Sequence, residues 1–240
     1  FHVVELAIDG LQDFELAGRV VEECRFEPRV LEYLVSKYIQ DGDIDSAIHW
    51  LGRAERHTGE TELQDTYRKQ RMFLSLRDLD DYDSALMIAD DAGDDGELLV
   101  ALADALAASE DSRAVHPYET AIDRAQDRST VSQRCAKLFK FALEQQLDEH
   151  IQFALVHTFE AGSFFEALTD KALEQGNKRA AFEWLLEWGK NTTEEKAQEE
   201  LYLRALELAL HQCDDIHLAR KVLGYTRNRA SYVDKIVQYY

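Results

Sequence analysis

The sequence predicts an all-α protein made of helix–turn–helix repeats. Its 240 residues include only two prolines and eleven glycines, so the chain has few points at which a helix must stop. A short turn pattern also recurs along the whole length, at intervals typical of paired helices. The apolar fraction of 45% is large enough to supply the buried faces of such helices.

The stretch Tyr38–Ala54, YIQDGDIDSAIHWLGRA, contains the clearest turn, and its alternating aspartates are also typical of the start of a calcium-binding loop. Such a loop needs a glycine after the third acid and a closing glutamate, but the sequence has Ser46 and Gly52 at these positions. We therefore interpret the acids as helix caps. Gly42 is expected to end one helix in the left-handed conformation, and Asp43 to cap the free amides of the next.

The same pattern occurs seven times: a polar or capping pair, a large residue, two spacers and usually alanine. The copies are QDFELA ending at Ala17, GDIDSA at Ala47, DDYDSA at Ala85, HPYETA at Ala121, QQLDEH at His150, GNKRAA at Ala181 and DDIHLA at Ala219. Successive copies are separated by about 29 to about 38 residues, and the average of about 34 is typical of a solenoid with two helices in each repeat.

Each alanine of the pattern is expected where two helices cross closely, beside a large residue that fills the groove between them. Seven aromatic residues lie on helix-period apolar faces and are expected in the core, with an exposed binding platform as the alternative. They are Trp50, Trp184, Trp188, Phe139, Phe141, Phe153 and Phe182.

With these copies the chain resembles the tetratricopeptide-repeat (TPR) family or a closely related helical-repeat family. The best copy matches the family pattern at Tyr38, Gly42, Asp43, Ile44, Ala47, Leu51 and Ala54, and the third copy keeps Asp81, Tyr82, Ala85, Ala89 and Ala92. The family's Trp-Leu-Gly opening and closing proline are absent, and Glu110–Pro117 is irregular. The resemblance implies a right-handed α-solenoid of about seven repeats, which occupies residues 1–240 as a single segment.

The chain begins with Phe1, and both of its ends fall within helical patterns, so we expect a segment of a longer protein. No apolar run is long enough to span a bilayer, which predicts no direct membrane insertion. Three widely separated cysteines predict no disulfide framework. Free thiols favour a reducing compartment such as the cytoplasm, with the bacterial periplasm as the alternative. The oligomeric state stays open at this point.

The formal net charge is -20, from 47 acidic and 27 basic residues that are spread along the chain. Such a field repels nucleic acid and anionic membranes, because each phosphate contact needs a lysine or an arginine. We therefore expect no nucleic-acid partner. The charge is typical of a well-solvated surface, and attraction of a basic partner is the sharper alternative.

The sequence has none of four motifs that carry common chemistry: His-Glu-x-x-His, Cys-x-x-Cys, a glycine-rich phosphate loop and Gly-x-Ser-x-Gly. His150 and His157 are expected to share a helix face, and His211, Cys213 and His217 are close in sequence, but neither set is typical of a metal site. DDAGDDG at 90–96 is expected to be a solvated connection. We predict no catalytic activity, no cofactor and no metal ion, with catalytic residues on separated helices as the alternative.

In proteins that this sequence resembles, the first helices of successive repeats line a concave groove that binds a partner protein or peptide. The resemblance implies inward positions at Arg29, Glu32, Tyr67, Gln70, Arg77, Arg204, His211 and Gln212. Some members bind a C-terminal carboxylate with Lys and Asn in this groove. Here Glu32 and Glu166 stand at such places, so that activity is not expected.

The principal hypothesis is therefore a non-catalytic scaffold that binds a partner protein or peptide on the concave face of a TPR-like solenoid. One alternative is a scaffold of a bacterial envelope assembly for polysaccharide export or secretion. Another is an RNA-binding helical repeat, which the charge of -20 disfavours.

Overall fold

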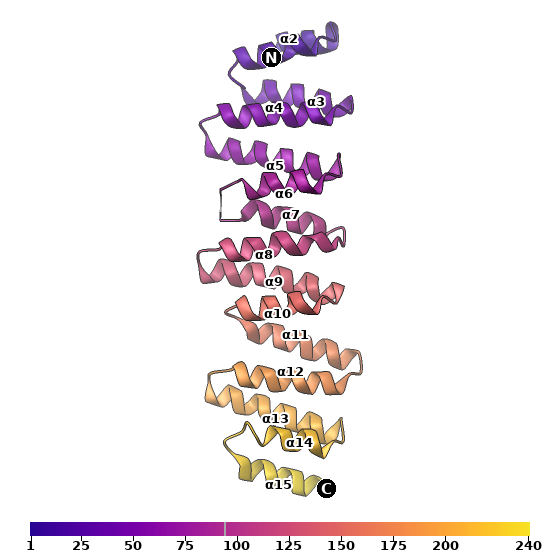
Figure 1. Ribbon diagram of the computed structural model, residues 1–240, viewed down its shortest axis with the longest axis vertical. Coiled ribbons are helices and arrows are strands. Elements are labelled where there is room, and N and C mark those ends of the chain that lie inside the picture. Colours follow the sequence, from indigo (N-terminus) through magenta and orange to yellow (C-terminus); the bar gives the residue numbers. More distant parts are fainter. Residues whose placement is uncertain (94) are drawn as a thin grey trace. The chain divides into compact units, whose positions relative to one another are not determined.

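The computed structural model describes residues 1–93 and 95–240, and in these residues every regular element is helical (Figure 1). The all-α class predicted from the sequence is confirmed. Residue 94, inside the expected connection DDAGDDG, lies outside the described residues. Among the described helices, none is both long and apolar enough to cross a membrane.

The chain divides into two compact units, residues 1–146 and 147–240. In the first unit, each helix from α3 to α8 packs on the helix that follows it along the chain. Its elements are α1 His2–Glu5, the π-helical turn Leu6–Gly10, α2 Phe14–Glu23, α3 Pro28–Gln40, α4 Ile44–His57, α5 Thr61–Arg77, α6 Tyr82–Asp90, α7 Glu97–Ala107, the 3-10 turn Ser112–Ala114, α8 Val115–Arg124 and α9 Arg128–Gln145.

In the second unit, α11, α12, α13 and α14 pack in the same consecutive way, and α15 packs on α13. Its elements are α10 Asp148–His157, α11 Ala161–Glu174, α12 Lys178–Asn191, α13 Glu195–His211, α14 Ile216–Val222 and α15 Arg229–Tyr239. The single uninterrupted segment expected for residues 1–240 stays a prediction.

The aspartates of the recurring pattern cap helices, as the sequence predicts. Oδ1 of Asp43 accepts a hydrogen bond from the Ser46 amide at 3.1 Å, and Gly42 has a φ of +79°. Asp13 and Asp81 cap α2 and α6 in the same way. A side chain that accepts from a free amide of the first turn stabilises the helix by about 1 kcal/mol. The interpretation of DGDID as a turn between helices is confirmed.

Two of the seven copies are placed differently from the prediction. HPYETA lies inside α8, because the turn comes earlier, at Asp111, whose carboxylate accepts a hydrogen bond from the Arg113 amide at 2.9 Å. In QQLDEH the buried position is Ile151, one residue after the predicted His150. The sequence pattern could not place these two turns because neither copy has an alanine at the fourth position after its cap.

With these corrections a shorter and a longer interval alternate between successive cap positions. The caps are Asp13, Asp43, Asp81, Asp111, Leu147, Asn177 and Asp215. The shorter interval is about 30 residues and the longer one about 37 residues, both close to the length of a helical-hairpin repeat. The repeating unit is therefore a set of four helices. A pattern averaged over single hairpins hides this alternation.

The four-helix sets α2–α5 and α10–α13 correspond to each other along the chain. Ile44, the first residue of α4, corresponds to Lys178, the first residue of α12, and we call the separation of these two residues the repeat offset. The same offset relates the last residues of α4 and α12, and both boundaries of α2 and α10 and of α5 and α13. The two sets also share a contact, because Gln64 donates to the Thr58 carbonyl at 2.8 Å, and Gln198 to the Thr192 carbonyl at 3.1 Å.

Each unit has a hydrophobic core at its helix crossings. Leu31, Leu34 and Leu51 are almost fully buried in the first unit, and Phe182 and Leu186 are fully buried in the second. The core prediction is confirmed for three of the seven aromatic residues, namely Phe139, Phe141 and Phe182. The other four, Trp50, Phe153, Trp184 and Trp188, are only half-buried.

Ala47 and Ala181 occupy corresponding positions on α4 and α12, and both are 0% exposed. Replacing either by leucine is expected to lower the free energy of unfolding by about 1–3 kcal/mol, because the added carbons have no space at the helix crossing. Urea denaturation followed by circular dichroism measures the change. Leucine at Ala108, an exposed alanine, is the control and is expected to change the stability by less than about 0.5 kcal/mol. Unchanged stability in both variants would contradict the predicted alignment of the repeats.

Candidate functional site

A groove in the first unit, here called the α3–α5 groove, brings together side chains from three helices. It has a volume of about 400 Å³. Its lining residues are Glu32, Val35, Ser36 and Ile39 of α3, Leu51 of α4, Gln70, Phe73, Leu74 and Arg77 of α5, and Asp78 just after α5. Its size is within the range of about 300–1,000 Å³ that is usual for ligand pockets.

The α3–α5 groove has an apolar floor and a charged rim. Val35 and Leu51 are 6% and 1% exposed, and Leu74 lies beside them in the lining. On the rim, the guanidinium of Arg77 lies 4.7 Å from the ring centre of Phe73. Such stacking restrains the long arginine side chain over the edge of the apolar floor.

A second groove, the α11–α13 groove, has the same construction in the second unit and a volume of about 360 Å³. Its lining residues are Thr169, Leu173, Leu185, Arg204, Glu207, Leu208, His211 and Gln212. The repeat offset relates every one of them to a residue that lines the α3–α5 groove. Leucine is kept at two of these positions, Leu51 with Leu185 and Leu74 with Leu208.

The charges around the two grooves differ. In the α3–α5 groove, Glu32 and Asp78 stand with Arg77, so acids outnumber bases. The lining of the α11–α13 groove contains one base, Arg204, and one acid, Glu207, both on α13. The guanidinium of Arg204 also lies 5.9 Å from the ring centre of Trp188 on α12. The apolar floor is the shared feature, and the polar rim distinguishes the two grooves.

The sequence prediction named eight inward residues, and six of them line these grooves. They are Glu32, Gln70 and Arg77 in the first unit, and Arg204, His211 and Gln212 in the second. Arg29 is exposed on α3 but is not among the described lining residues. Tyr67 is 2% exposed and belongs to the hydrophobic core of the first unit, so its side chain contributes to the fold beneath the surface.

The sequence pattern did not indicate the apolar floor of either groove, which includes Val35, Leu51, Leu185 and Leu208. These residues are indistinguishable from core residues in a helical pattern, because all lie on apolar helix faces. An alignment of the chain with itself at the repeat offset would have drawn attention to them. Leucine recurs there in both copies.

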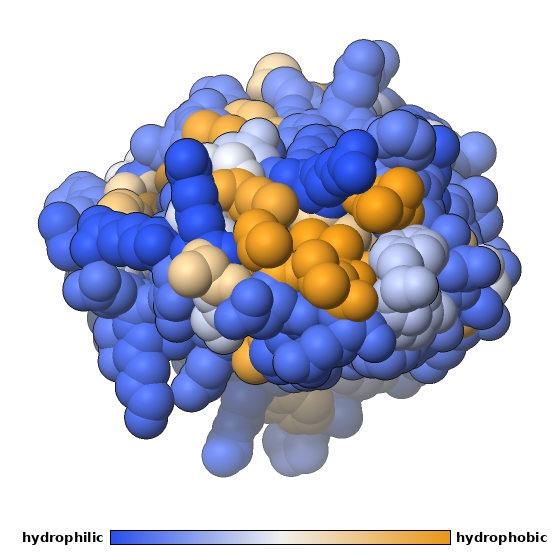
Figure 2. Space-filling model, turned by 90° about the horizontal axis from the view of Figure 1, so that it is seen from below, coloured by the Kyte–Doolittle hydropathy of each residue, from blue (hydrophilic) through white to orange (hydrophobic). Residues whose placement is uncertain are grey.

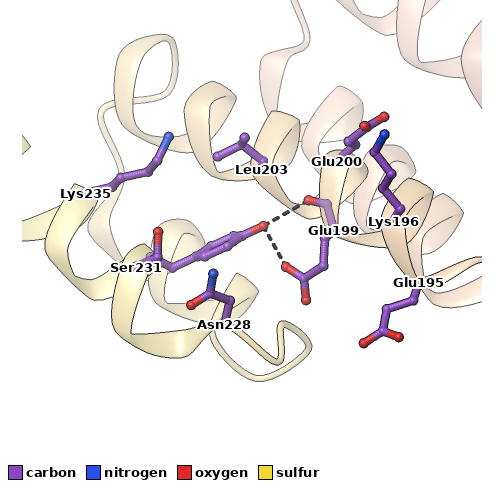
Figure 3. A pocket seen from close by; sticks show the side chains of 9 residues that line it. Glu195, Lys196, Glu199, Glu200, Leu203, Asn228, Ser231 and Lys235 are labelled. Atoms are coloured by element: carbon purple, nitrogen blue, oxygen red, sulfur yellow. Dashed lines mark hydrogen bonds between the residues drawn. The ribbon is translucent and has the colours of Figure 1, made fainter.

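A third cleft, of about 590 Å³, lies between α13 and α15 (Figure 3). Its centre is occupied by contacts that hold α15 in place. The Tyr232 hydroxyl donates to the Glu199 carbonyl at 2.9 Å and to its carboxylate at 3.1 Å. The Glu199 carboxylate also accepts from Thr226 and from the Arg227 amide. Burial and the hydrogen bond to Glu199 raise the pKa of Tyr232 to about 12. These contacts indicate a structural role.

Two valines of α15 are exposed among its polar residues. Val233 and Val237 are one helical turn apart and are 43% and 70% exposed. Figure 2, which views the molecule from the end where α15 lies, shows hydrophobic side chains gathered on this face. The contacts of α15 therefore leave one apolar stripe of this helix open to solvent.

The histidine and cysteine sets from the sequence do not converge. Nδ1 of His157 donates to the Phe153 carbonyl at 2.8 Å, and the two rings stack at 3.9 Å. The ring of His211 packs edge-on against Tyr239, and burial raises the pKa of the Cys213 thiol. In residues 1–93 and 95–240, no three histidine, cysteine or acidic side chains are arranged to hold a metal ion.

Comparisons of the sequence with models of known protein families and with curated proteins give no match.

Proposed function

We propose that this chain is a non-catalytic interaction scaffold, a TPR-like right-handed solenoid of about seven helical hairpins. Its α3–α5 and α11–α13 grooves each bind an apolar side chain of a partner protein or peptide. The observation that carries the proposal is the recurrence of one groove, lined at corresponding positions, in two units of the same chain.

The groove floors supply the affinity in this proposal. Burying one leucine-sized side chain of a partner against Val35, Leu51 and Leu74 contributes about 1.5–3 kcal/mol. This is too little for a stable complex, because association itself costs about 4 kcal/mol or more. Two grooves on one chain add their contributions when one partner spans both, and such bivalence strengthens binding by about 10²–10⁴-fold.

The groove rims supply the specificity. Glu32 and Asp78 favour a basic residue beside the apolar anchor in the first groove, whereas Arg204 and His211 favour an acidic or neutral neighbour in the second. The net charge of -20 adds a long-range attraction for a positively charged partner and opposes binding to RNA.

Peptides selected from a random dodecapeptide phage library test this proposal. The groove-filling substitutions are Gln70→Trp and Arg204→Trp, which lie at corresponding exposed positions. We expect enriched peptides to carry apolar anchors, and each single substitution to weaken the calorimetric binding of peptides that use its groove. The double variant is expected to bind none of them.

Lys69→Trp is the matched control, because Lys69 is exposed on the same helix as Gln70 and is not among the described lining residues. It should leave peptide binding unchanged. Circular dichroism checks that all variants keep their helix content. The proposal is wrong if the double variant binds the enriched peptides as tightly as the original chain.

A further inference from the structure

A further pocket of the second unit lies outside the two grooves, at the connections that follow α10 and α12. This loop-side pocket has a volume of about 740 Å³. Leu155, Phe165, Trp184 and Trp188 form apolar walls, and both tryptophans are half-buried. Aromatic walls of this kind offer large contact areas, and each indole also has an N–H group that can donate.

The corresponding place in the first unit is filled by the chain itself. Phe26, which the repeat offset relates to Glu160, is 7% exposed. Its ring stacks on His57 at 4.9 Å and lies 6.5 Å from Trp50, the counterpart of Trp184. The same hydrophobic cluster contains Val21 and Leu31, the counterparts of Leu155 and Phe165. An aromatic ring thus occupies the place that is open in the second unit.

The backbone of the loop explains the difference. Arg25 and Phe26 have φ values of +53° and +58°, a left-handed conformation that is unfavourable for a residue other than glycine. Burial of the Phe26 ring is favourable and compensates for this conformation. Glu160 has no apolar ring to bury, and it has a φ of -127°. The neighbouring Phe159 lines the pocket but is 57% exposed, so no ring of this loop fills the pocket.

A cation in the first unit is replaced by an acid in the second. The guanidinium of Arg53 lies 5.9 Å from the ring of Phe26 and 5.1 Å from that of Trp50. The residue that corresponds to Arg53 is Glu187, on the rim of the loop-side pocket. The Glu187 carboxylate forms an ion pair with Lys190, one helical turn further along α12, at 2.9 Å. Such a solvent-accessible ion pair contributes little to stability.

All charged residues in the described lining of the loop-side pocket are acidic. Glu160, Glu187 and Glu194 contribute carboxylates, and the lining contains no lysine or arginine. The second unit thus lacks both the ring of Phe26 and the cation of Arg53, while it keeps aromatic walls and adds negative charge. A ligand that brings a ring and a cation together would restore both contacts.

We propose that the loop-side pocket binds an aromatic side chain of a partner peptide in which a basic residue is adjacent to the aromatic one. The ring enters between the walls formed by Trp184 and Trp188, and the cation pairs with Glu187. The loop-side pocket shares no lining residue with the two grooves, so this proposal can be tested independently of the proposed function.

A fluorescein-labelled octapeptide, Gly-Ser-Gly-Phe-Arg-Gly-Ser-Gly, tests the proposal by fluorescence anisotropy with the full chain. Control peptides carry Ala-Arg or Phe-Glu in place of Phe-Arg. We expect the Phe-Arg peptide to bind at least about tenfold more tightly than either control, because each control lacks one of the two contacts.

Glu187→Arg introduces on the rim the residue type found at the corresponding position of the first unit, Arg53. We expect it to weaken binding of the Phe-Arg peptide about tenfold and to strengthen binding of the Phe-Glu peptide, a reversal that a loss of structure cannot produce. Glu174→Arg, an equal charge change at an exposed position outside the described lining, is the control and should have no such effect. Groove-filling Gln70→Trp, in the first unit, should also leave the Phe-Arg affinity unchanged.

Two results would overturn the proposal. One is equal affinity of the unaltered chain for the Phe-Arg and Phe-Glu peptides, which would remove the role of the acidic rim. The other is displacement of the Phe-Arg peptide by tetramethylammonium chloride but not by sodium chloride at the same concentration. The pocket would then take a bare organic cation between its aromatic walls.

Discussion

Replacing Phe182 by alanine is expected to lower the free energy of unfolding by about 3–5 kcal/mol. Phe182 is 0% exposed and is the largest fully buried side chain of α12. Its cluster includes Leu186, Leu206 and Val222, from three helices of the second unit, so the removed ring leaves a cavity that no single helix can close. Guanidinium denaturation followed by circular dichroism measures the loss.

Phe159→Ala is the matched control, because it removes the same side chain at a position that is 57% exposed. We expect it to cost less than about 1 kcal/mol. Tryptophan fluorescence adds a test of location, since Trp184 and Trp188 lie in the second unit and Trp50 in the first. Equal destabilisation by the two substitutions would contradict the assignment of Phe182 to the core.

Replacing Gly189 by glutamate is expected to destabilise the second unit by about 3 kcal/mol or more. A Cβ atom on Gly189 would lie 2.8 Å from Cδ1 of Tyr202, whose ring is 2% exposed, so the two side chains cannot both keep their places. The introduced carboxylate would also lie at a buried position of α12. Urea denaturation gives the change in stability.

The first unit shows which second substitution should compensate. Glu55 and Arg68 are the counterparts of Gly189 and Tyr202, and their side chains form an ion pair at 2.8 Å. Tyr202→Arg in the Gly189→Glu background removes the ring and supplies the cation. We expect the pair to recover about 1–3 kcal/mol relative to the sum of the single substitutions.

Asn191→Glu adds the same charge at an exposed position near the end of α12 and serves as the control for Gly189→Glu. It is expected to cost less than about 1 kcal/mol. If the effects of Gly189→Glu and Tyr202→Arg were additive, the double variant would recover no stability. This result would show that the second unit cannot form an ion pair equivalent to Glu55–Arg68.

The sequence determined the helices and most of their starts, because these features depend on nearby residues. Asp13, Asp43, Asp81 and Asp215 each cap a helix whose amide lies two or three residues further along the chain. Such contacts can be predicted from a short stretch of sequence. The two misplaced turns, in HPYETA and QQLDEH, are those in which this local pattern is incomplete.

Six of the eight residues named from the sequence line the grooves, and they were named through a family resemblance that gives the spacing of inward positions. The floors of the grooves could not be predicted in the same way. Leu51 and Leu74 come from different helices, and the groove exists only where those helices leave space between them. Helix packing distances, and not helix periodicity, determine such a space.

The loop-side pocket shows most clearly what only the tertiary structure decided. The loops that contain Phe26 and Glu160 follow corresponding helices, α2 and α10, and lead into α3 and α11. In the first unit, burial of the Phe26 ring compensates for the unfavourable left-handed conformation of two loop residues. In the second unit no such ring is buried, and a cavity lined by two tryptophans is open. The sequence determined which side chains are present. Their packing decided which places are filled and which stay open, because burial energy is set by neighbours that are distant along the chain.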